Sequence, residues 1–243
     1  MKYKAITFSY DDGVEQDKRL IEILERYGLR ATFNLNSGLF DKRTSHSGRV
    51  FGFDAVFNNH RIPGDEICEV YKNHEIASHS LTHPILPALS DEEVIFQMSE
   101  DAKALEGITG KKIHGFAYPG GVGEYCNQRV ADVIENNTSL YYGRTVKSTR
   151  SFELPKSLML LDPTISHREI SVREGLAREF LSLEADTPKL FYVWGHSYEL
   201  DVDESVWTDF ERFCELISGR DDIFYGTNDE VFRHFGLNNL TEE

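Results

Sequence analysis

The alternation of short apolar runs with helix-like segments constrains the fold of this chain more than any other feature. Runs rich in β-branched and aromatic residues recur along the 243 residues, and segments between many of them repeat apolar side chains at helical spacing, as Leu20, Ile23 and Leu24 do. Because a helix returns the chain to the edge where the previous strand began, such alternation builds a mostly parallel sheet. The chain is therefore predicted to be an α/β protein.

Individual elements can be placed approximately from the same patterns. Strands are expected at residues 5–10, 31–35, 75–77, 113–117, 140–142, 157–160, 190–194 and 223–225. Helices are expected at residues 15–27, 64–73, 90–107, 127–136, 171–185, 204–218 and 229–235.

The number and order of these strands favour a closed sheet over an open, doubly wound one. The order is irregular, since no clear helix separates the strand at 140–142 from that at 157–160. Residues 36–63 are too long for an ordinary loop. No linker, repeat or low-complexity segment divides the chain. We therefore predict that residues 1–243 form one domain, an irregular or distorted (β/α) barrel of about seven or eight strands.

The composition excludes several classes of partner. A formal net charge of −15 opposes binding to nucleic acid and to anionic membranes, and it permits neutral or amine-bearing substrates. Three scattered cysteines form neither a metal knuckle nor a disulfide framework. No apolar run is long enough to span a membrane. The first residues lack a signal-peptide pattern, so the chain is expected to be cytoplasmic unless a leader has been removed.

Two short motifs carry the chemistry. Asp11 and Asp12 directly follow the first strand, and His79 and His83 lie four residues apart after the third. One carboxylate and two imidazoles are a typical ligand set for a catalytic metal with an open position, and the spare carboxylate can act as a general base. Alone, each motif has an ordinary alternative: a turn for the aspartates, and a surface or capping pair for the histidines.

Together the motifs resemble those of the polysaccharide deacetylase family (NodB-like, carbohydrate esterase family 4), whose fold is a distorted (β/α) barrel. The resemblance implies that Asp11 is the base and that Asp12, His79 and His83 bind a divalent metal. Zinc suits this ligand set best, and cobalt, manganese or nickel could also occupy it.

Two further stretches agree with the resemblance. Residues 116–121 are similar to the family's third motif, which implies that the Gly120 N–H donates to the oxyanion. Ala117 stands where the family often has an arginine, and Arg144, after the fifth strand, is the candidate replacement. Residues 190–196 resemble the fifth motif, which implies that His196 is the general acid.

The fourth motif, an aspartate that orients the acid, is not recognisable. Tyr118, Trp194 and Tyr198 are candidate substrate contacts, and His167 receives no role.

The resemblance implies hydrolysis of N-acetyl groups on an amino-sugar-containing glycan or oligosaccharide. Two alternatives stay open: an enzyme that cleaves another C–N bond or an O-acetyl bond, such as a cyclic imide, a ureide or an acetylated sugar, and a non-catalytic carbohydrate-binding barrel. The substrate and the oligomeric state are not readable from the sequence.

Overall fold

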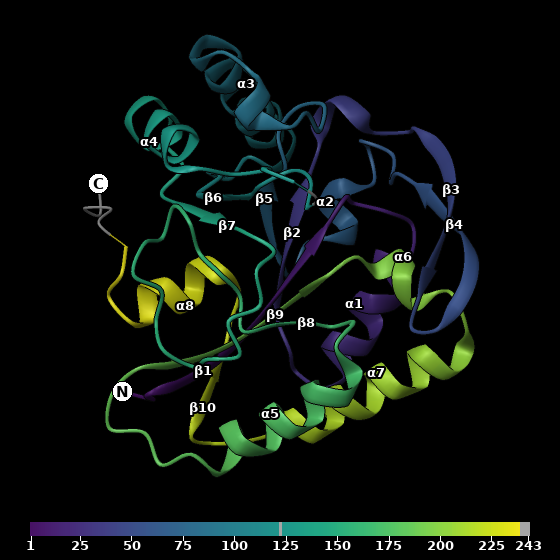
Figure 1. The fold of residues 1–243 in the computed structure, drawn as a ribbon, viewed down its shortest axis with the longest axis vertical. Helices are drawn as coiled ribbons and strands as arrows, with labels where there is room; N and C mark the ends of the chain where they lie inside the picture. The colour runs from purple at the N-terminus through teal and green to yellow at the C-terminus, as the bar shows by residue number, and fades with distance from the viewer. Residues whose placement is uncertain (122, 239–243) are drawn as a thin grey trace.

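One curved, parallel sheet organises the molecule. The computed structural model describes residues 1–121 and 123–238 (Figure 1). Within these residues the strands run in the order β7-β6-β5-β2-β1-β9-β8, and β10 also pairs with β1. The strands are β1 Lys4–Asp11, β2 Ala31–Leu35, β5 Glu75–Ser78, β6 Gly115–Ala117, β7 Tyr142–Arg144, β8 Ile165–Ser166, β9 Lys189–Gly195 and β10 Ile223–Tyr225.

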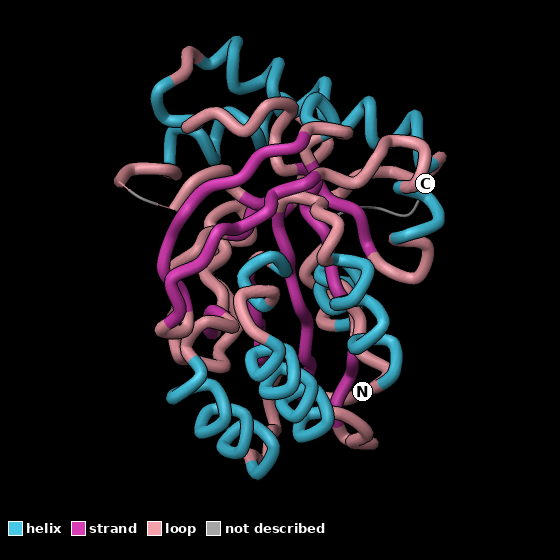
Figure 2. Tube along the Cα trace, turned by 90° about the vertical axis from the view of Figure 1, so that its right-hand side faces the viewer, coloured by secondary structure: helices cyan, strands magenta, loops and turns pink. Residues whose placement is uncertain are grey.

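Helices pack on both sides of the strands (Figure 2). They are α1 Asp17–Arg26, α2 Ile67–Val70, α3 Asp91–Thr109, α4 Gln128–Asn137, α5 Ile170–Ser182, α6 Ser197–Leu200, α7 Glu204–Ile217 and α8 Asn228–His234. Two short 3₁₀ helices lie at Ser37–Leu39 and Leu86–Ala88. No helix in the described ranges is long and apolar enough to cross a membrane.

The predicted irregular barrel is confirmed. Its irregularity lies in the segment between β7 and α5, which pairs first with β7 and then with β9. The segment after Leu158 pairs with β7 through Leu161 N–H, which donates to the Gly143 carbonyl at 2.9 Å. A few residues later the same segment becomes β8, where Ile165 is in register with Val193 of β9. Pro163 stands between the two pairings and has no N–H to donate, so a continuous strand is not formed. The strand predicted at 157–160 was therefore wrong.

The long stretch after β2 is a β-hairpin, which the sequence analysis did not foresee. β3 (Arg43–Val50) pairs antiparallel with β4 (Phe53–His60). Phe51 and Gly52 both have positive φ, 51° and 86°, as in the two-residue turns that match the twist of a hairpin. β3 is almost entirely exposed, so it lacks the apolar alternation that identifies a half-buried strand. The hairpin stands at the edge of the barrel beside α6 (Figure 1).

The first residues of α8 close the end of the barrel opposite the expected site. Asn228 lies inside, where its side chain accepts from Thr7 at 3.0 Å and donates to the Tyr192 hydroxyl at 2.7 Å. Its backbone N–H donates to the Thr32 hydroxyl at 2.9 Å. These bonds satisfy polar groups that would otherwise be buried without partners. The carboxyl ends of the strands, at the other side, are left free to build a site.

A pair of glycine substitutions tests the packing of β6 against β7. A methyl group on Gly115 in β6 would lie 1.9 Å from the ring of Tyr142, whose hydroxyl donates to Glu75 at 2.7 Å. Since this ring is held in place, we expect Gly115→Ala to lower the free energy of unfolding by about 1–3 kcal/mol. Gly107 in α3 has open space around it, so Gly107→Ala should instead raise that free energy by about 0.5–1 kcal/mol. Denaturant unfolding of both variants measures these opposite changes in the free energy of unfolding. A Gly115→Ala protein as stable as the parent would contradict the β6–β7 packing.

Candidate metal centre and active site

Three side chains expected to bind a metal lie together at the carboxyl ends of two strands. Asp12 follows β1, and His79 and His83 follow β5. Their ligand atoms all lie within 4.8 Å of one another. Asp12 and His83 have φ values of 86° and 62°, which are costly for residues with a side chain and are maintained only where the surrounding structure imposes them. Two strained residues in one cluster are typical of a functional site.

The two imidazoles are prepared to act as ligands. The Nδ1 atom of His79 lies 2.9 Å from the Ala117 carbonyl, so Nδ1 carries the proton and Nε2 is left as the free donor. Burial lowers the pKa of His79 to about 4, which makes the ring neutral at physiological pH. His83 is placed by a tight turn in which its backbone N–H donates to the Ser80 hydroxyl at 3.1 Å. Neutral imidazoles and an ionised aspartate are the protonation states that a divalent metal requires.

Asp11 is held as a buried carboxylate beside this cluster. Its side chain accepts from the guanidinium of Arg144 with both oxygens, and from Asn34 at 2.8 Å. Burial by itself raises the pKa of Asp11, but the charge of Arg144, the nearby His79 and His196, and the hydrogen bonds of Arg144 together more than offset it, so the pKa lies below its ordinary value. Arg144 is fully buried and lies over the Trp194 ring, 4.8 Å from its centroid. The structure thus places on Asp11 the arginine that the sequence offered as a replacement.

His196 extends from the end of β9 toward both aspartates. Its Nε2 lies 3.9 Å from Asp11 Oδ2 and 4.0 Å from Asp12 Oδ2, and its Nδ1 lies 2.7 Å from Glu199 Oε1. Burial lowers the pKa of His196, but the Glu199 carboxylate and then the two aspartates raise it to about 9. In the absence of metal, His196 is therefore cationic at neutral pH.

Glu199 is the functional candidate that sequence reasoning missed. It is buried and accepts from three cationic or polar groups, namely His196, His167 at 2.7 Å and the fork of Arg168. Burial opposes ionisation, yet these partners lower the pKa of Glu199 well below its ordinary value. The sequence feature that could have identified Glu199 is its position three residues after His196, which places both residues on one side of the short α6 turn. His167, which had no assigned role, holds the second oxygen of this carboxylate.

The three candidate metal ligands and His196 border a cavity of about 700 Å³. Of the three residues expected to contact substrate, Trp194 and Tyr198 line the cavity, whereas Tyr118 does not. Gly120, the expected oxyanion donor, also lines it. Tyr118 is fully buried and donates its hydroxyl to the Met159 carbonyl at 2.8 Å, so we correct that expectation and leave it out of the site. Gly120 has φ 97°, and a methyl group there would lie 2.8 Å from Ile85, so the position favours glycine.

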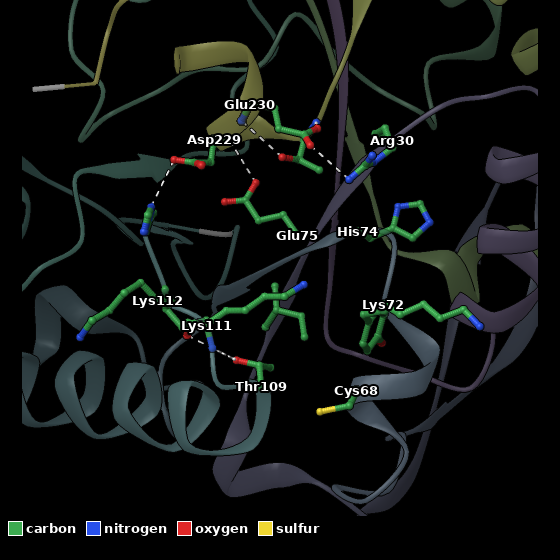
Figure 3. Close-up of a pocket in the computed structure, with 15 residues that line it drawn as sticks. Arg30, Cys68, Lys72, His74, Glu75, Thr109, Lys111, Lys112, Asp229 and Glu230 are labelled. Carbon is green, nitrogen blue, oxygen red and sulfur yellow. Dashed lines mark hydrogen bonds and ion pairs between the residues drawn. The ribbon is translucent and has the colours of Figure 1, made fainter. Parts of the chain in front are cut away.

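A second cavity, of about 320 Å³, lies near the start of β5 and the first turn of α8 (Figure 3). Its buried carboxyl group, Glu75, already accepts from the Thr32 hydroxyl at 2.6 Å, the Tyr142 hydroxyl at 2.7 Å and the Asp229 N–H at 3.1 Å. The cluster of candidate metal ligands found in the described ranges borders the other cavity. The chemistry therefore concentrates at the carboxyl ends of the strands.

The fold and the position of the site define a (β/α)-barrel protein with its reactive groups at the carboxyl ends of the strands. A family model described as polysaccharide deacetylase matches residues 1–156, which is more than half of the 243 residues. This chain belongs to the polysaccharide deacetylase family. A search of curated proteins found no match.

Solved structures of related proteins share the fold of this chain. A protein from Mycobacterium smegmatis assigned as a polysaccharide deacetylase is similar with a TM-score of 0.68 and 16% identity, over 100% of this chain and 93% of its own. A family 4 carbohydrate esterase from Streptomyces lividans, in complex with acetate, has a TM-score of 0.54 and 14% identity, over 93% and 92%. A family 4 pseudoenzyme from Bacillus anthracis has a TM-score of 0.52 and 16% identity, over 95% and 66%. At such low identities these similarities establish the fold.

The pKa of His196 gives a direct test of the Glu199 contact. In the metal-free protein, the imidazole resonances of His196 should titrate near pH 9. Glu199→Gln removes the carboxylate that contributes most to raising this pKa, so the titration should move to lower pH. Nuclear magnetic resonance of the labelled imidazole measures the shift.

The contact between His196 and Glu199 should also make the free energy of unfolding depend on pH in a defined direction. A histidine whose pKa is raised by folding stabilises the folded state below its ordinary pKa, and this contribution is lost as pH rises through about 9. Glu199→Gln should reduce that pH dependence. Glu204→Gln removes an equal charge from an exposed ion pair with Arg19 and serves as the control. An unchanged His196 titration in Glu199→Gln would exclude Glu199 as the orienting group.

Proposed function

We propose that this protein is a metal-dependent hydrolase that removes N-acetyl groups from an amino-sugar-containing glycan or oligosaccharide. The observation that carries the proposal is the meeting of the Asp12, His79 and His83 cluster with Asp11 and His196 beside one cavity. Membership of the polysaccharide deacetylase family supports the reaction class. Trp194 and Tyr198 supply aromatic surfaces to the cavity on which a sugar ring can stack.

A divalent metal held by Asp12, His79 and His83 would polarise the acyl carbonyl and lower the pKa of the attacking water. Zinc fits these ligands, as do cobalt, manganese and nickel. Asp11, kept ionised by Arg144, accepts the proton of the attacking water. The Gly120 N–H is the candidate donor to the oxyanion.

His196 completes the reaction by protonating the departing amine, after which acetate leaves. Its hydrogen bond with Glu199 directs Nε2 into the cavity, and the Glu199 carboxylate favours the cationic ring that a proton donor must have. Each proton therefore has a named donor and acceptor.

Two alternatives to N-deacetylation are an enzyme that cleaves a different bond and a protein without catalytic activity. A C–N bond in a cyclic imide or ureide, or an O-acetyl bond, could be cleaved by the same groups. A non-catalytic barrel is a real possibility within this fold, since the similar Bacillus anthracis protein is a pseudoenzyme. This chain, however, retains the complete set of Asp11, Asp12, His79, His83 and His196, and these groups are within reach of one another.

Substitution of Asp11 and of Asp12 should impair the protein in different ways, and this difference tests the proposed function. Acetate release from N-acetylglucosamine oligomers should require a divalent metal and be abolished by a chelator. Asp12→Asn should weaken metal binding, because a neutral amide is a poor zinc ligand. Asp11→Asn should keep the metal and lose about 10²–10⁴-fold in kcat, the usual contribution of a general base. Elemental analysis and an acetate assay on both variants give the comparison.

Control variants make the result specific. Asp54→Asn removes an equal charge from an exposed hairpin side chain and should change neither measurement. Metal loss in Asp11→Asn with retention in Asp12→Asn would reverse the two roles. Wild-type protein that binds metal and releases no acetate from any acetylated sugar would favour the non-catalytic alternative.

His196 should matter more for amides than for esters. An amide nitrogen must be protonated before it leaves, whereas an activated phenolate departs without a proton. We expect His196→Ala to slow N-deacetylation by about 10²-fold or more, and hydrolysis of an aryl acetate much less. Both rates are measured at matched metal content. Equal losses on the two substrates would mean that His196 holds substrate or structure and is not the proton donor.

A further inference from the structure

Arg61 contacts the aspartate assigned as a metal ligand, although no step of the reaction above uses it. Its Nη2 atom lies 2.8 Å from Asp12 Oδ1, and its Nη1 donates to the backbone carbonyl of the same residue. The exposed fractions of the two side chains are 9% for Arg61 and 7% for Asp12. An ion pair this buried is costly to form unless its geometry is well fixed, so its presence at a ligand requires a physical reason.

The backbone around Arg61 is joined to the loop that carries Asp12. Arg61 directly follows β4, at the exit of the hairpin. On one side of it Ile62 N–H donates to the Gly13 carbonyl at 2.9 Å, and on the other Glu15 N–H donates to the His60 carbonyl at 2.9 Å. The hairpin exit therefore runs antiparallel to the loop after β1 and delivers the guanidinium at a fixed position.

The hairpin is also anchored at the wall of the cavity. The ring of Phe57 in β4 lies 5.7 Å from that of Tyr198, and the ring of His46 in β3 lies 5.8 Å from it. Asn59 and Arg61 line the same cavity. The hairpin thus joins the aromatic wall of the cavity to the ligand Asp12.

Arg61 holds Asp12 in one conformation, through a hydrogen bond to its carbonyl and an ion pair with one of its two carboxylate oxygens. The left-handed backbone of Asp12, with φ 86°, is stabilised because the guanidinium binds the carbonyl and the carboxylate of that residue together. Oδ1 lies 2.8 Å from Arg61 Nη2 in the ion pair and has no hydrogen-bond donor among the described residues, whereas Oδ2 lies toward His196, 4.0 Å from its Nε2. A carboxylate with both oxygens free can bind a metal through two atoms. A guanidinium held against one oxygen competes with the metal for that oxygen and so favours ligation through the other.

The geometry points to Arg61 as a positioning residue that limits Asp12 to ligation through one oxygen and so keeps a metal position open for substrate. This inference rests on the proposed function, because it needs a metal at Asp12. It also gives the hairpin a second role, in addition to forming a wall of the cavity.

Cobalt(II) absorption tests the inference without relying on activity, because the visible absorption per bound ion falls as the number of ligands rises. In Arg61→Ala, Asp12 is free to bind through both oxygens, so each bound cobalt ion should absorb less than in the wild type. The kcat for acetate release should fall by about 10–100-fold, the usual effect of removing a partner of a metal ligand. Arg61→Lys keeps a cation near Oδ1 and should give a spectrum closer to the wild type.

Arg49→Ala is the matched control, since Arg49 lies on the same hairpin in an exposed ion pair with Asp54. It should leave both the spectrum and kcat unchanged. Circular dichroism and unfolding midpoints confirm that each variant is folded. An unchanged cobalt spectrum in folded Arg61→Ala, or loss of cobalt binding by it, would overturn the inference while wild-type deacetylation stands. Wild-type protein that binds no cobalt and no zinc would instead overturn the proposed function, and this inference with it.

Discussion

Two adjacent carboxylates are buried side by side at the end of β1, and the rest of the site depends on keeping both ionised. Burial and mutual repulsion each raise the pKa of such groups. The structure offsets this in part by giving each aspartate its own arginine, the buried Arg144 for Asp11 and the largely buried Arg61 for Asp12. One arginine comes from β7 and the other from the hairpin exit. The curvature of the sheet and the return of the hairpin to the loop after β1 therefore both help to keep the carboxylates charged.

His196, the proposed acid, has the opposite arrangement: a buried carboxylate, Glu199, stabilises its positive charge. Glu199 stays ionised because His196, His167 and Arg168 surround it. The loop after β9 is in turn tied to the start of α1, where the Ser197 hydroxyl donates to Asp17. The proposed base, Asp11, and the proposed acid, His196, are thus held by separate ion pairs on different strands. Hydrolysis of an amide needs one group that accepts a proton and another that donates one, and this separation lets both exist at the same pH.

Family membership and the particular chain contribute different things. The curved parallel sheet is shared with a solved polysaccharide deacetylase structure, and residues 1–156 match the family model. In this chain Arg144 contacts Asp11, Glu199 lies three residues after the candidate acid, and a hairpin contributes an arginine at Asp12. The cavity is consequently bounded by Arg61 and Arg168 as well as by aromatic rings. These charged and aromatic groups are where substrate preference has to be sought.

The sequence by itself determined the α/β class, most of the strands and helices, and the grouping of Asp11, Asp12, His79, His83 and His196. It could do so because apolar periodicity marks elements, and because polar residues after parallel strands meet at one edge. Only the tertiary structure decided the rest. The exposed strand β3 had no apolar pattern, and Tyr118, a candidate substrate contact, proved to be buried. The contacts of Arg61 and Arg144 join distant segments, and that of Glu199 depends on the turn after His196. Partners of buried charges are chosen by three-dimensional proximity, which local pattern does not encode.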